Sequence, residues 1–277
     1  MLITQVGYVG VWGIGLVDLL ARIDHPERLA ALPSVTGFIE SNFNLAVSHA
    51  VNQVKAQLPP SDGERTGFVL ASAYGDVTTA DVASQRLAKG RVHNPLLFYQ
   101  SIPNSILGHL SRVEGFTGPM TCFSAGSLLL THALVMAELA LAEGSADRML
   151  IVGVDLARSE RIRATEEAIV ARGIPLVTTA PAADTVVVLS VQADTGDPTS
   201  KGIRISSVPS RPIRSRSQQP DSMAAFLDVC MAFAGENPPE QVVLDVCEVR
   251  ELHVEYQLVQ VAAARNGACD VVPGGSR

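Results

Sequence analysis

The cysteines and carboxylates are the side chains of this sequence most able to do chemistry, and their spacing brings few of them together. Four cysteines lie far apart without a CxxC pair: Cys122, Cys230, Cys247 and Cys269. This spacing favours reduced, mostly buried thiols over disulfides or a zinc site. Asp155 and Glu248 are single carboxylates, whereas acid–base chemistry needs a pair. Because no phosphate-binding loop, dinucleotide fingerprint or metal-ligand cluster occurs, we expect neither a cofactor nor a metal.

The composition is that of an ordered globular protein that is unusually rich in apolar residues. Of 277 residues, 47% are hydrophobic and 18% are charged, and the mean hydropathy is +0.24. Glu138 and Glu143 interrupt the longest apolar stretch, so we expect no membrane span. The apolar excess predicts an obligate subunit interface, which resembles a domain core cut in half. The net charge of -7 argues against nucleic acid as a partner. Residues 1–15 show no signal-peptide pattern, which predicts a cytoplasmic protein.

Short apolar runs alternate with longer helical patterns, which is the order of an α/β fold. The strand patterns are residues 2–9, 67–72, 120–124, 149–154 and 185–190, and the helical patterns among them are 43–57, 77–89 and 127–144. The runs 67–72 and 149–154 are apolar on both faces, as strands covered by helices on each side must be. The sequence therefore predicts a layered, buried sheet.

The stretch 127–144 is apolar around nearly its whole circumference and ends at Gly144. We expect it to form a helix that is buried at the centre of the fold. A polar stretch rich in Pro, Ser and Arg then separates residues 1–208 from a shorter set of helix and strand patterns. This division predicts a large first part, residues 1–208, and a shortened remnant, residues 209–277, packed on the same core.

Several short motifs stand in a fixed order around this helix. They are the run 101–111 with its Gly108-His109 pair, Gly118-Pro119, Gly144-Ser-Ala-Asp147 and Gly153-Val-Asp155. In this order they resemble the first half of the β-ketoacyl synthases, which have the thiolase fold. The resemblance implies a thiolase-like layered α/β/α fold, mostly the first half of a ketosynthase with a shortened second half. It covers residues 1–208 well and residues 221–248 faintly.

The resemblance places Ser127 where these enzymes carry their nucleophilic cysteine, at a tight elbow between strand and helix. Active relatives also use two histidines, one in a His-Gly-Thr turn and one in a later Gly-His motif. Here residues 247–249 read Cys-Glu-Val at the first position, and no later Gly-His follows. His132 lies at a helical spacing that turns it away from Ser127. A serine without a nearby base is a poor nucleophile, so we expect no catalytic residue in this chain.

The family offers a precedent in type II polyketide synthases, where an active ketosynthase pairs with a non-catalytic relative called a chain length factor. The resemblance implies the same heterodimer here, served by an acyl carrier protein. The shortness of the chain resembles the chain length factors of polyene-forming systems. In the thiolase fold the strand before the nucleophile pairs with its counterpart in the partner. The expected interface residues are therefore Met120, Thr121, Cys122 and Phe123.

The segment before that strand lines or closes the acyl tunnel in such relatives. The corresponding apolar residues here are Phe98, Tyr99, Ile102, Ile106 and Leu107. Ordinary core packing is an equal alternative for them, since any core needs such a run. The arginines of a basic stretch predict a surface that steers an acidic carrier protein, unless they form only a solvated loop. These residues are Arg204, Arg211, Arg214 and Arg216.

Two other functions stay open from the sequence. Ser127 would carry an acyl group if the chain were a serine-dependent acyltransferase, with a base supplied by a partner or by His253. A stand-alone protein that presents this fold to an acyl carrier is the third possibility. A chain that needs its partner should be insoluble or aggregated by itself. Expression of the chain alone therefore distinguishes a subunit of a heterodimer from a stand-alone protein.

Overall fold

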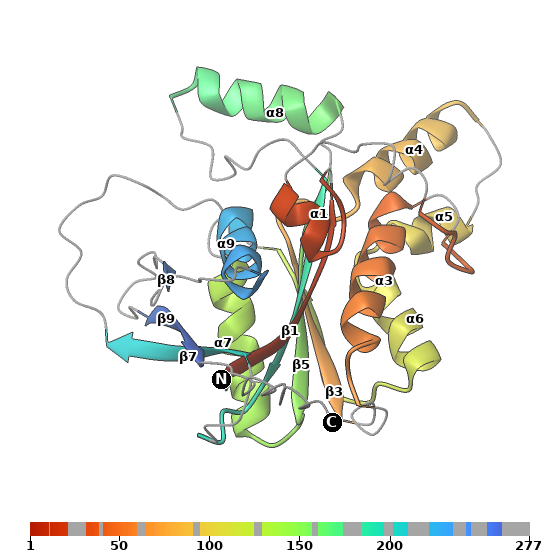
Figure 1. Ribbon diagram of the computed structural model, residues 1–277. Helices are drawn as coiled ribbons and strands as arrows, with labels where there is room; N and C mark the ends of the chain where they lie inside the picture. Colours follow the sequence, from red (N-terminus) through yellow and green to blue (C-terminus); the bar gives the residue numbers. More distant parts are fainter. Residues whose placement is uncertain are drawn as a thin grey trace, which may run out of the picture.

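The structure is a computed structural model, in which one mixed sheet forms the centre of the molecule (Figure 1). It describes residues 1–10, 12–21, 32–38, 41–59, 65–90, 95–124, 129–156, 160–173, 184–196, 202–209, 222–234, 242–244 and 254–261. Across the sheet the strands are β4 (Met120–Phe123), β3 (Thr66–Ser72), β5 (Arg148–Asp155), β6 (Thr185–Gln192), β1 (Leu2–Gly10), β7 (Gly202–Pro209), β9 (Val254–Val261) and β8 (Val242–Leu244), and β2 (Gly13–Ile14) pairs with β1.

The strand directions place the carboxyl ends of four strands at one end of the sheet. Strands β4, β3 and β5 run parallel to one another. Strand β6 runs against both of its neighbours, so β1 has the same direction as β5. Strand β4 stands at the end of the strand order, and β3 is its single strand partner within the described residues. One edge of the sheet is therefore open at β4.

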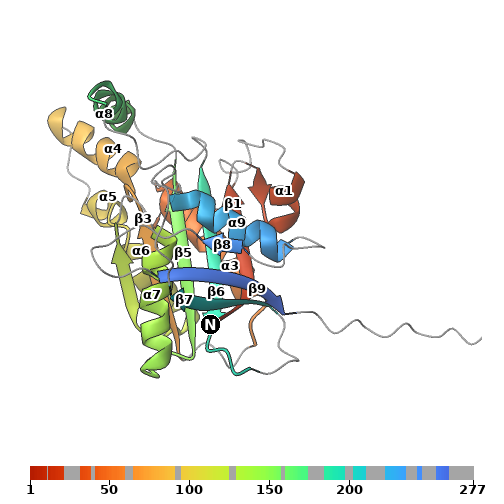
Figure 2. The ribbon, with the colours of Figure 1, turned by 90° about the vertical axis from the view of Figure 1, so that its left-hand side faces the viewer.

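Helices cover both faces of the sheet (Figures 1 and 2). Helices α3 (Asn42–Lys55) and α6 (Ser105–Glu114) lie on one face, and α7 (Leu129–Ala142) and α9 (Ser222–Ala234) lie on the other. Helix α5 (Pro95–Gln100) contacts both α6 and α4 (Val77–Ala88), and α1 (Leu16–Ala21) contacts α9. Helix α8 (Glu160–Ala171) lies beyond the ends of the central strands. The predicted layered α/β/α arrangement is confirmed.

Two apolar clusters, one on each face of the sheet, form the core. Along β3, Phe68 and Leu70 pack with α3 and α6, whereas Val69 packs with α7 and α9. Strands β3 and β5 are buried along their whole length, as their apolar runs predicted. Helix α9 approaches β5 closely because Gly153 has no side chain, and a Cβ there would lie 2.7 Å from the ring of Phe226.

Helix α9, from the predicted second part, packs against elements of the first part. Met223, Phe226 and Val229 of α9 belong to the same apolar cluster as the buried side of α7. The expected boundary between residues 208 and 209 falls inside β7, a strand that pairs with both β1 and β9. The division into two parts stays a prediction.

Helix α7 differs from the expectation on one side. Its buried residues face the sheet and α9, but Val135, Met136 and Leu139 are exposed. The prediction of a helix buried all round is wrong, because the described part of the chain covers only one side of it. An all-apolar helix must be covered, but its sequence does not state which chain supplies the cover.

Candidate functional site

The turn after β4 is where the resemblance places the family's nucleophile. Ser127 lies outside the described residues, as do Cys247 and His253. The Ser124 hydroxyl, just before this turn, donates a hydrogen bond of 2.7 Å to the carbonyl of Ala73. This bond ties the residue that follows β4 to the residue that follows β3. The role of Ser127 stays a prediction.

Strand β4 carries apolar side chains at the open edge of the sheet. In the parallel pairing with β3, Met120 and Cys122 stand beside residues of the α6-side cluster, so they point to that side. Thr121 and Phe123 point to the α7 side. Met120 is 49% exposed, and Cys122 is exposed as well. An open edge of this kind is a template for pairing with a strand of another chain.

The exposure of Cys122 corrects the expectation of a buried strand thiol. The strand pattern was right, but no described strand or helix covers the outer edge of β4. Neighbouring atoms still desolvate the sulfur and raise the pKa of Cys122, which keeps the thiol protonated at neutral pH. Cys230 on α9 is fully buried, and burial raises its pKa strongly. These two described thiols are therefore poor nucleophiles.

Helix α7 continues the surface of β4. The ring of His132, near the start of α7, meets the ring of Phe123 edge to face at a centroid distance of 6.2 Å. Val135, Met136 and Leu139 follow His132 at helical spacing, so they lie on the same side of the helix. Leu139 is 51% exposed. We call these largely apolar residues of β4 and α7 the edge surface, and its residues are Met120, Thr121, Cys122, Phe123, Val135, Met136 and Leu139.

The α7 part of the edge surface was not among the predicted interface residues. A signal was present, because Glu138 is the one charged residue of the helix, so apolar residues must also face away from the core. To recognise these residues as part of an interface, one must know that α7 lies near the open edge, and the sequence alone does not show this.

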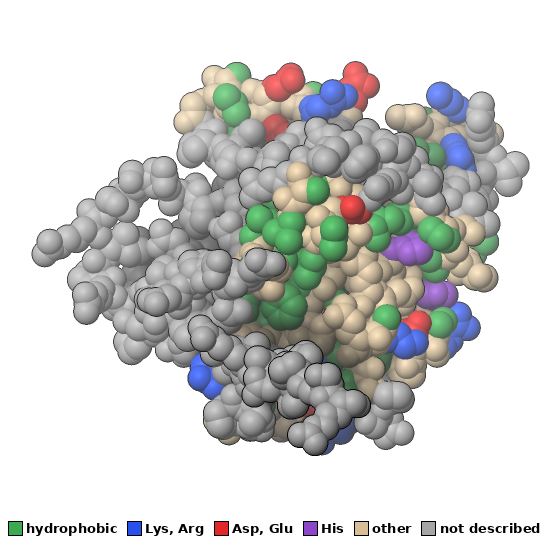
Figure 3. Space-filling view, viewed as in Figure 1, with side chains coloured by type: hydrophobic (Ala, Val, Ile, Leu, Met, Phe, Trp, Pro, Cys, Tyr) green, Lys and Arg blue, Asp and Glu red, His purple; other side chains and the backbone are tan. Residues whose placement is uncertain are grey.

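A second exposed apolar patch, formed by Ile14, Val17 and Leu20 around α1, lies at the centre of the face in Figure 3. Because α1 packs on β1, β2 and α9, this patch is separate from β4.

The segment before β4 divides into exposed and buried residues. Phe98 and Tyr99 on α5 and Ile102 after it are exposed, Phe98 at 61%. Ile106 and Leu107 on α6 are buried in the cluster that α6 shares with α3 and the sheet. This burial favours ordinary core packing for Ile106 and Leu107, one of the two alternatives left open by the sequence. The other three residues reach the surface.

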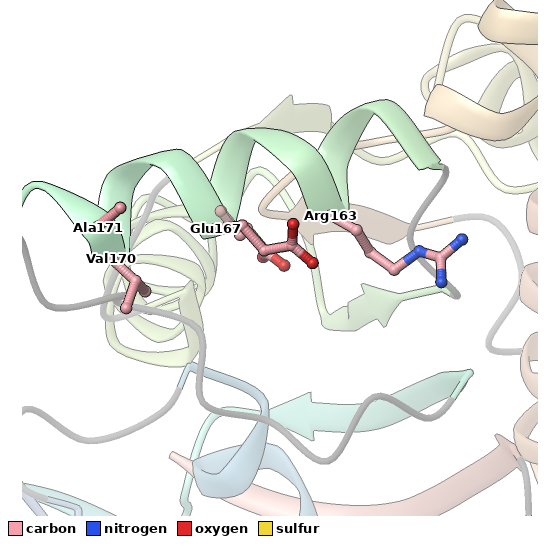
Figure 4. Close-up of a pocket in the computed structure, with 5 residues that line it drawn as sticks. Arg163, Glu167, Val170 and Ala171 are labelled. Atoms are coloured by element: carbon pink, nitrogen blue, oxygen red, sulfur yellow. The ribbon is translucent and has the colours of Figure 1, made fainter.

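Helix α8 supplies acidic and basic side chains beyond the ends of β3 and β5 (Figure 3). Tyr74, just after β3, donates a hydrogen bond of 2.7 Å to the buried carboxylate of Glu166. One of two cavities near α8, of about 600 Å³, lies between α4 and α8, where Arg161 forms an ion pair with Asp81 at 2.8 Å. The other cavity, of about 390 Å³, lies along α8 and is shown in Figure 4. Its lining comprises Arg163, Glu166, Glu167, Val170 and Ala171. The described linings of these two cavities contain no cysteine or histidine.

The basic residues predicted to steer a carrier protein are described only in part. The Arg204 guanidinium on β7 donates hydrogen bonds to both carboxylate oxygens of Asp194. These bonds hold the pKa of Asp194 below its usual range. A carrier protein must compete with Asp194 for this guanidinium. Arg211, Arg214 and Arg216 lie outside the described residues, and their role stays a prediction.

The remaining chemistry-bearing groups have structural surroundings. The His109 ring packs edge to face on Phe38 at 5.2 Å, and partial burial together with Arg112 lowers the pKa of His109. Within the described ranges, no group of three or more side chains could hold a metal ion. In the same part of the chain, no helix is long and apolar enough to cross a membrane.

Comparison with family models identifies the class of protein. Residues 45–225 match the model of the N-terminal domain of β-ketoacyl synthases, which is more than half of the chain. The chain therefore belongs to this family, and its layers form the thiolase-like fold of the first half of a ketosynthase. A comparison with curated proteins gives no match.

Solved structures with this fold include ketosynthase complexes. The chain resembles a chain of the ketosynthase ApeO in complex with its chain length factor ApeC from Xenorhabdus doucetiae, with a TM-score of 0.65 and 16% identity over 93% of this chain and 98% of that one. The ishigamide ketosynthase/chain length factor gives 0.53 and 15% over 74% and 67%. A β-ketoacyl synthase from Burkholderia phymatum STM815 gives 0.52 and 14% over 83% and 69%. At these identities the likeness shows the fold. The first match also has nearly the length of this chain.

Proposed function

We propose that this chain is the non-catalytic chain-length-factor subunit of a heterodimeric ketosynthase that elongates polyketide, including polyene, chains. The edge surface carries this proposal. Exposed apolar residues on an open sheet edge and on the outer side of α7 have the character of a contact that an obligate partner covers. The partner is an active ketosynthase subunit, because the strand before the family's nucleophile is the strand that the thiolase fold pairs between subunits.

The sequence around the elbow supports a silent rather than a catalytic subunit. Ser127 stands at the family's cysteine position, and Cys247-Glu-Val249 stands where the His-Gly-Thr turn would be. Nucleophile and base act as a unit, so the loss of both leaves pairing and tunnel shaping as the remaining roles. The similar chain of nearly equal length belongs to a complex of a ketosynthase with its chain length factor, which is consistent with this role. We place the heterodimer in the cytoplasm, with an acyl carrier protein as the source of the growing chain.

A matched pair of substitutions tests the edge surface. Leu139 and Leu87 are exposed to almost the same extent, 51% and 52%, but Leu87 lies on α4, outside the edge surface. A glutamate at a buried interface must lose water without gaining a partner, which is costly. Leu139→Glu should weaken binding to the ketosynthase about 100-fold or more, and Leu87→Glu should change it less than about threefold. Equal effects of the two variants on co-purification would reject the edge surface as the interface.

A second measurement separates the proposed function from a serine-dependent acyltransferase. The purified heterodimer is incubated with an acyl thioester, and the intact mass of each subunit is then measured by mass spectrometry. The proposal predicts an acyl adduct on the ketosynthase partner and none on this chain. An adduct at Ser127 would show that this subunit is catalytic.

A further inference from the structure

A buried polar network centred on Asn44 joins α3 to the end of α5. Asn44 lies in the first turn of α3 and is completely buried. Its Nδ2 atom donates to the Ser41 hydroxyl at 2.8 Å and to the backbone carbonyl of Gln100 at 2.7 Å. Gln100, also buried, donates from its own side chain to the carbonyl of Gly37 at 2.7 Å. The last residue of α5 is thus bonded to two distant parts of the chain.

The other half of the network is anchored on two capped helices. The Ser41 hydroxyl caps α3 by accepting from the Asn44 backbone amide at 3.1 Å, and it donates to Asp76 at 2.5 Å. Asp76 in turn caps α4 by accepting from the Thr79 amide at 3.2 Å. Both caps are buried. The Asn44 side chain is therefore held in place by two helix starts, and α5 is attached to it.

Helix α5 contacts α4 and α6 and packs Tyr99 against Phe38, but few of its side chains are buried. Only Leu97 and Gln100 of its residues are buried. The last carbonyls of a helix have no partner inside the helix. The three carbonyls before Gln100 accept hydrogen bonds from Ser101 and Ile102, which directly follow the helix. The Gln100 carbonyl instead accepts from Asn44, a bond that the neighbouring sequence does not supply.

The chemistry of the network requires an amide at position 44. Both protons of Nδ2 are used, one on Ser41 and one on Gln100, whereas the buried Oδ1 atom of Asn44 has no hydrogen-bond partner among the residues that the structure describes. An unpaired buried acceptor is unfavourable, so packing alone does not explain this side chain. An aspartate has the same shape but no Nδ2 donors.

We propose that Asn44 is a positioning residue that sets the place of α5, and through it the place of Phe98 and Tyr99 at the end of the acyl tunnel. This inference rests on the proposed function. Tyr99 directly precedes Gln100, so a displacement of the helix end moves both aromatic side chains. The length of acyl chain that the tunnel admits then depends on a hydrogen bond made by a residue that does not line it.

The test compares Asn44→Ala and Asn44→Asp with Val54→Ala in the reconstituted heterodimer. Val54 is fully buried near the other end of α3, so its truncation loosens the same helix without touching α5. Hydrogen exchange of the α5 amides should accelerate about tenfold in both Asn44 variants and stay unchanged in Val54→Ala. The main product should change by at least one extension unit in the Asn44 variants, while Val54→Ala should lower only the melting temperature.

Each outcome decides the inference. Unchanged exchange in α5 would overturn the positioning role, and faster exchange with an unchanged product would place α5 away from the tunnel. The same product change in Val54→Ala would mean that any loosening of α3 alters the product, which would contradict a specific role of the bond between Asn44 and α5. Asn44→Asp keeps the shape of the side chain but buries a carboxyl group near Asp76. The melting temperature of each variant heterodimer is therefore measured first, with Val54→Ala as the control for a general loss of stability. A wild-type chain that does not assemble with a ketosynthase would overturn the proposed function, whereas an assembled heterodimer with the same α5 exchange in every variant would overturn the positioning role of Asn44 alone.

Discussion

Phe98 and Ile106 belong to one apolar segment, but the structure gives them opposite surroundings. The Phe98 side chain on α5 is 61% exposed, whereas Ile106 on α6 is 0% exposed and packs between α3 and the sheet. Truncating each residue to alanine should therefore separate chain-length control from stability. We predict that Phe98→Ala changes the product and that Ile106→Ala changes the stability.

The magnitudes follow from these exposures. Ile106→Ala removes side-chain atoms from a packed cluster and should lower the free energy of unfolding by about 2–5 kcal/mol. Full burial of a phenylalanine is worth about 1.5–3 kcal/mol, and Phe98 keeps less than half of its surface covered, so Phe98→Ala should cost at most about 1 kcal/mol. In a chain of this size, 1 kcal/mol corresponds to about 2–4 °C in melting temperature. The difference between the two variants is large enough to measure.

The assay combines thermal unfolding of the heterodimer with the product distribution, at fixed subunit concentration because assembly stabilises each chain. Phe98→Ala should lengthen the main product by about two to four carbons, since the freed aromatic volume holds several methylenes. Ile106→Ala should give the original product from a less stable complex. A Phe98→Ala complex that makes the original product would refute the assignment of Phe98 to the tunnel end. A longer product from Ile106→Ala would refute the core assignment of Ile106.

Three further predictions concern the elbow, the basic stretch and the buried cap. Ser127→Ala should leave the activity of the assembled heterodimer within about threefold of wild type, and a loss of a hundredfold would contradict a silent elbow. Changing Arg211, Arg214 and Arg216 together to serine should slow the carrier-dependent reaction at low ionic strength and much less at high salt, so an unchanged low-salt rate would remove the steering role. Burial raises the pKa of Asp76, despite hydrogen bonds from Ser41 and Thr79 that lower it. The folded chain therefore holds this proton to higher pH than the unfolded chain, and the free energy of unfolding should fall as pH rises from the ordinary carboxyl range through the raised pKa. Urea titrations across that range should show a smaller fall in Asp76→Asn.

The sheet was predictable because its strands are buried on both faces. The apolar runs at 67–72 and 149–154 leave no polar side that could face water, and they became β3 and β5. Helices α5, α6 and α8 and strands β7 and β9 were not predicted. Helix α5 has six residues, too short for a helical period to show, and the first eight residues of α8 are polar or charged apart from Ile162 and Ala164. Their places are fixed by tertiary contacts such as those of Gln100 and Glu166.

The candidate interface was predictable only through the resemblance. Nothing in the sequence of residues 120–123 distinguishes a strand at an open edge from a strand in the middle of a sheet. The same limit produced the wrong expectations for Cys122 and for the outer side of α7, because burial depends on which elements are neighbours. Asn44 gave no signal either. A polar residue in the first turn of a helix is ordinary, and its buried bond to Gln100 crosses 56 positions.

The two elements that form the edge surface are those that flank the family's nucleophile. Strand β4 leads into the elbow and α7 leads out of it, so in an active relative the same pair holds the catalytic residue. In this chain their positions depend on other bonds: the Ser124 hydroxyl ties β4 to Ala73, and α7 packs its buried side on the sheet and α9. Neither contact involves the side chain at position 127. Under the proposed function, a substitution at position 127 would abolish the chemistry without removing these two contacts, so a silent subunit would keep the surface that pairs it with an active one.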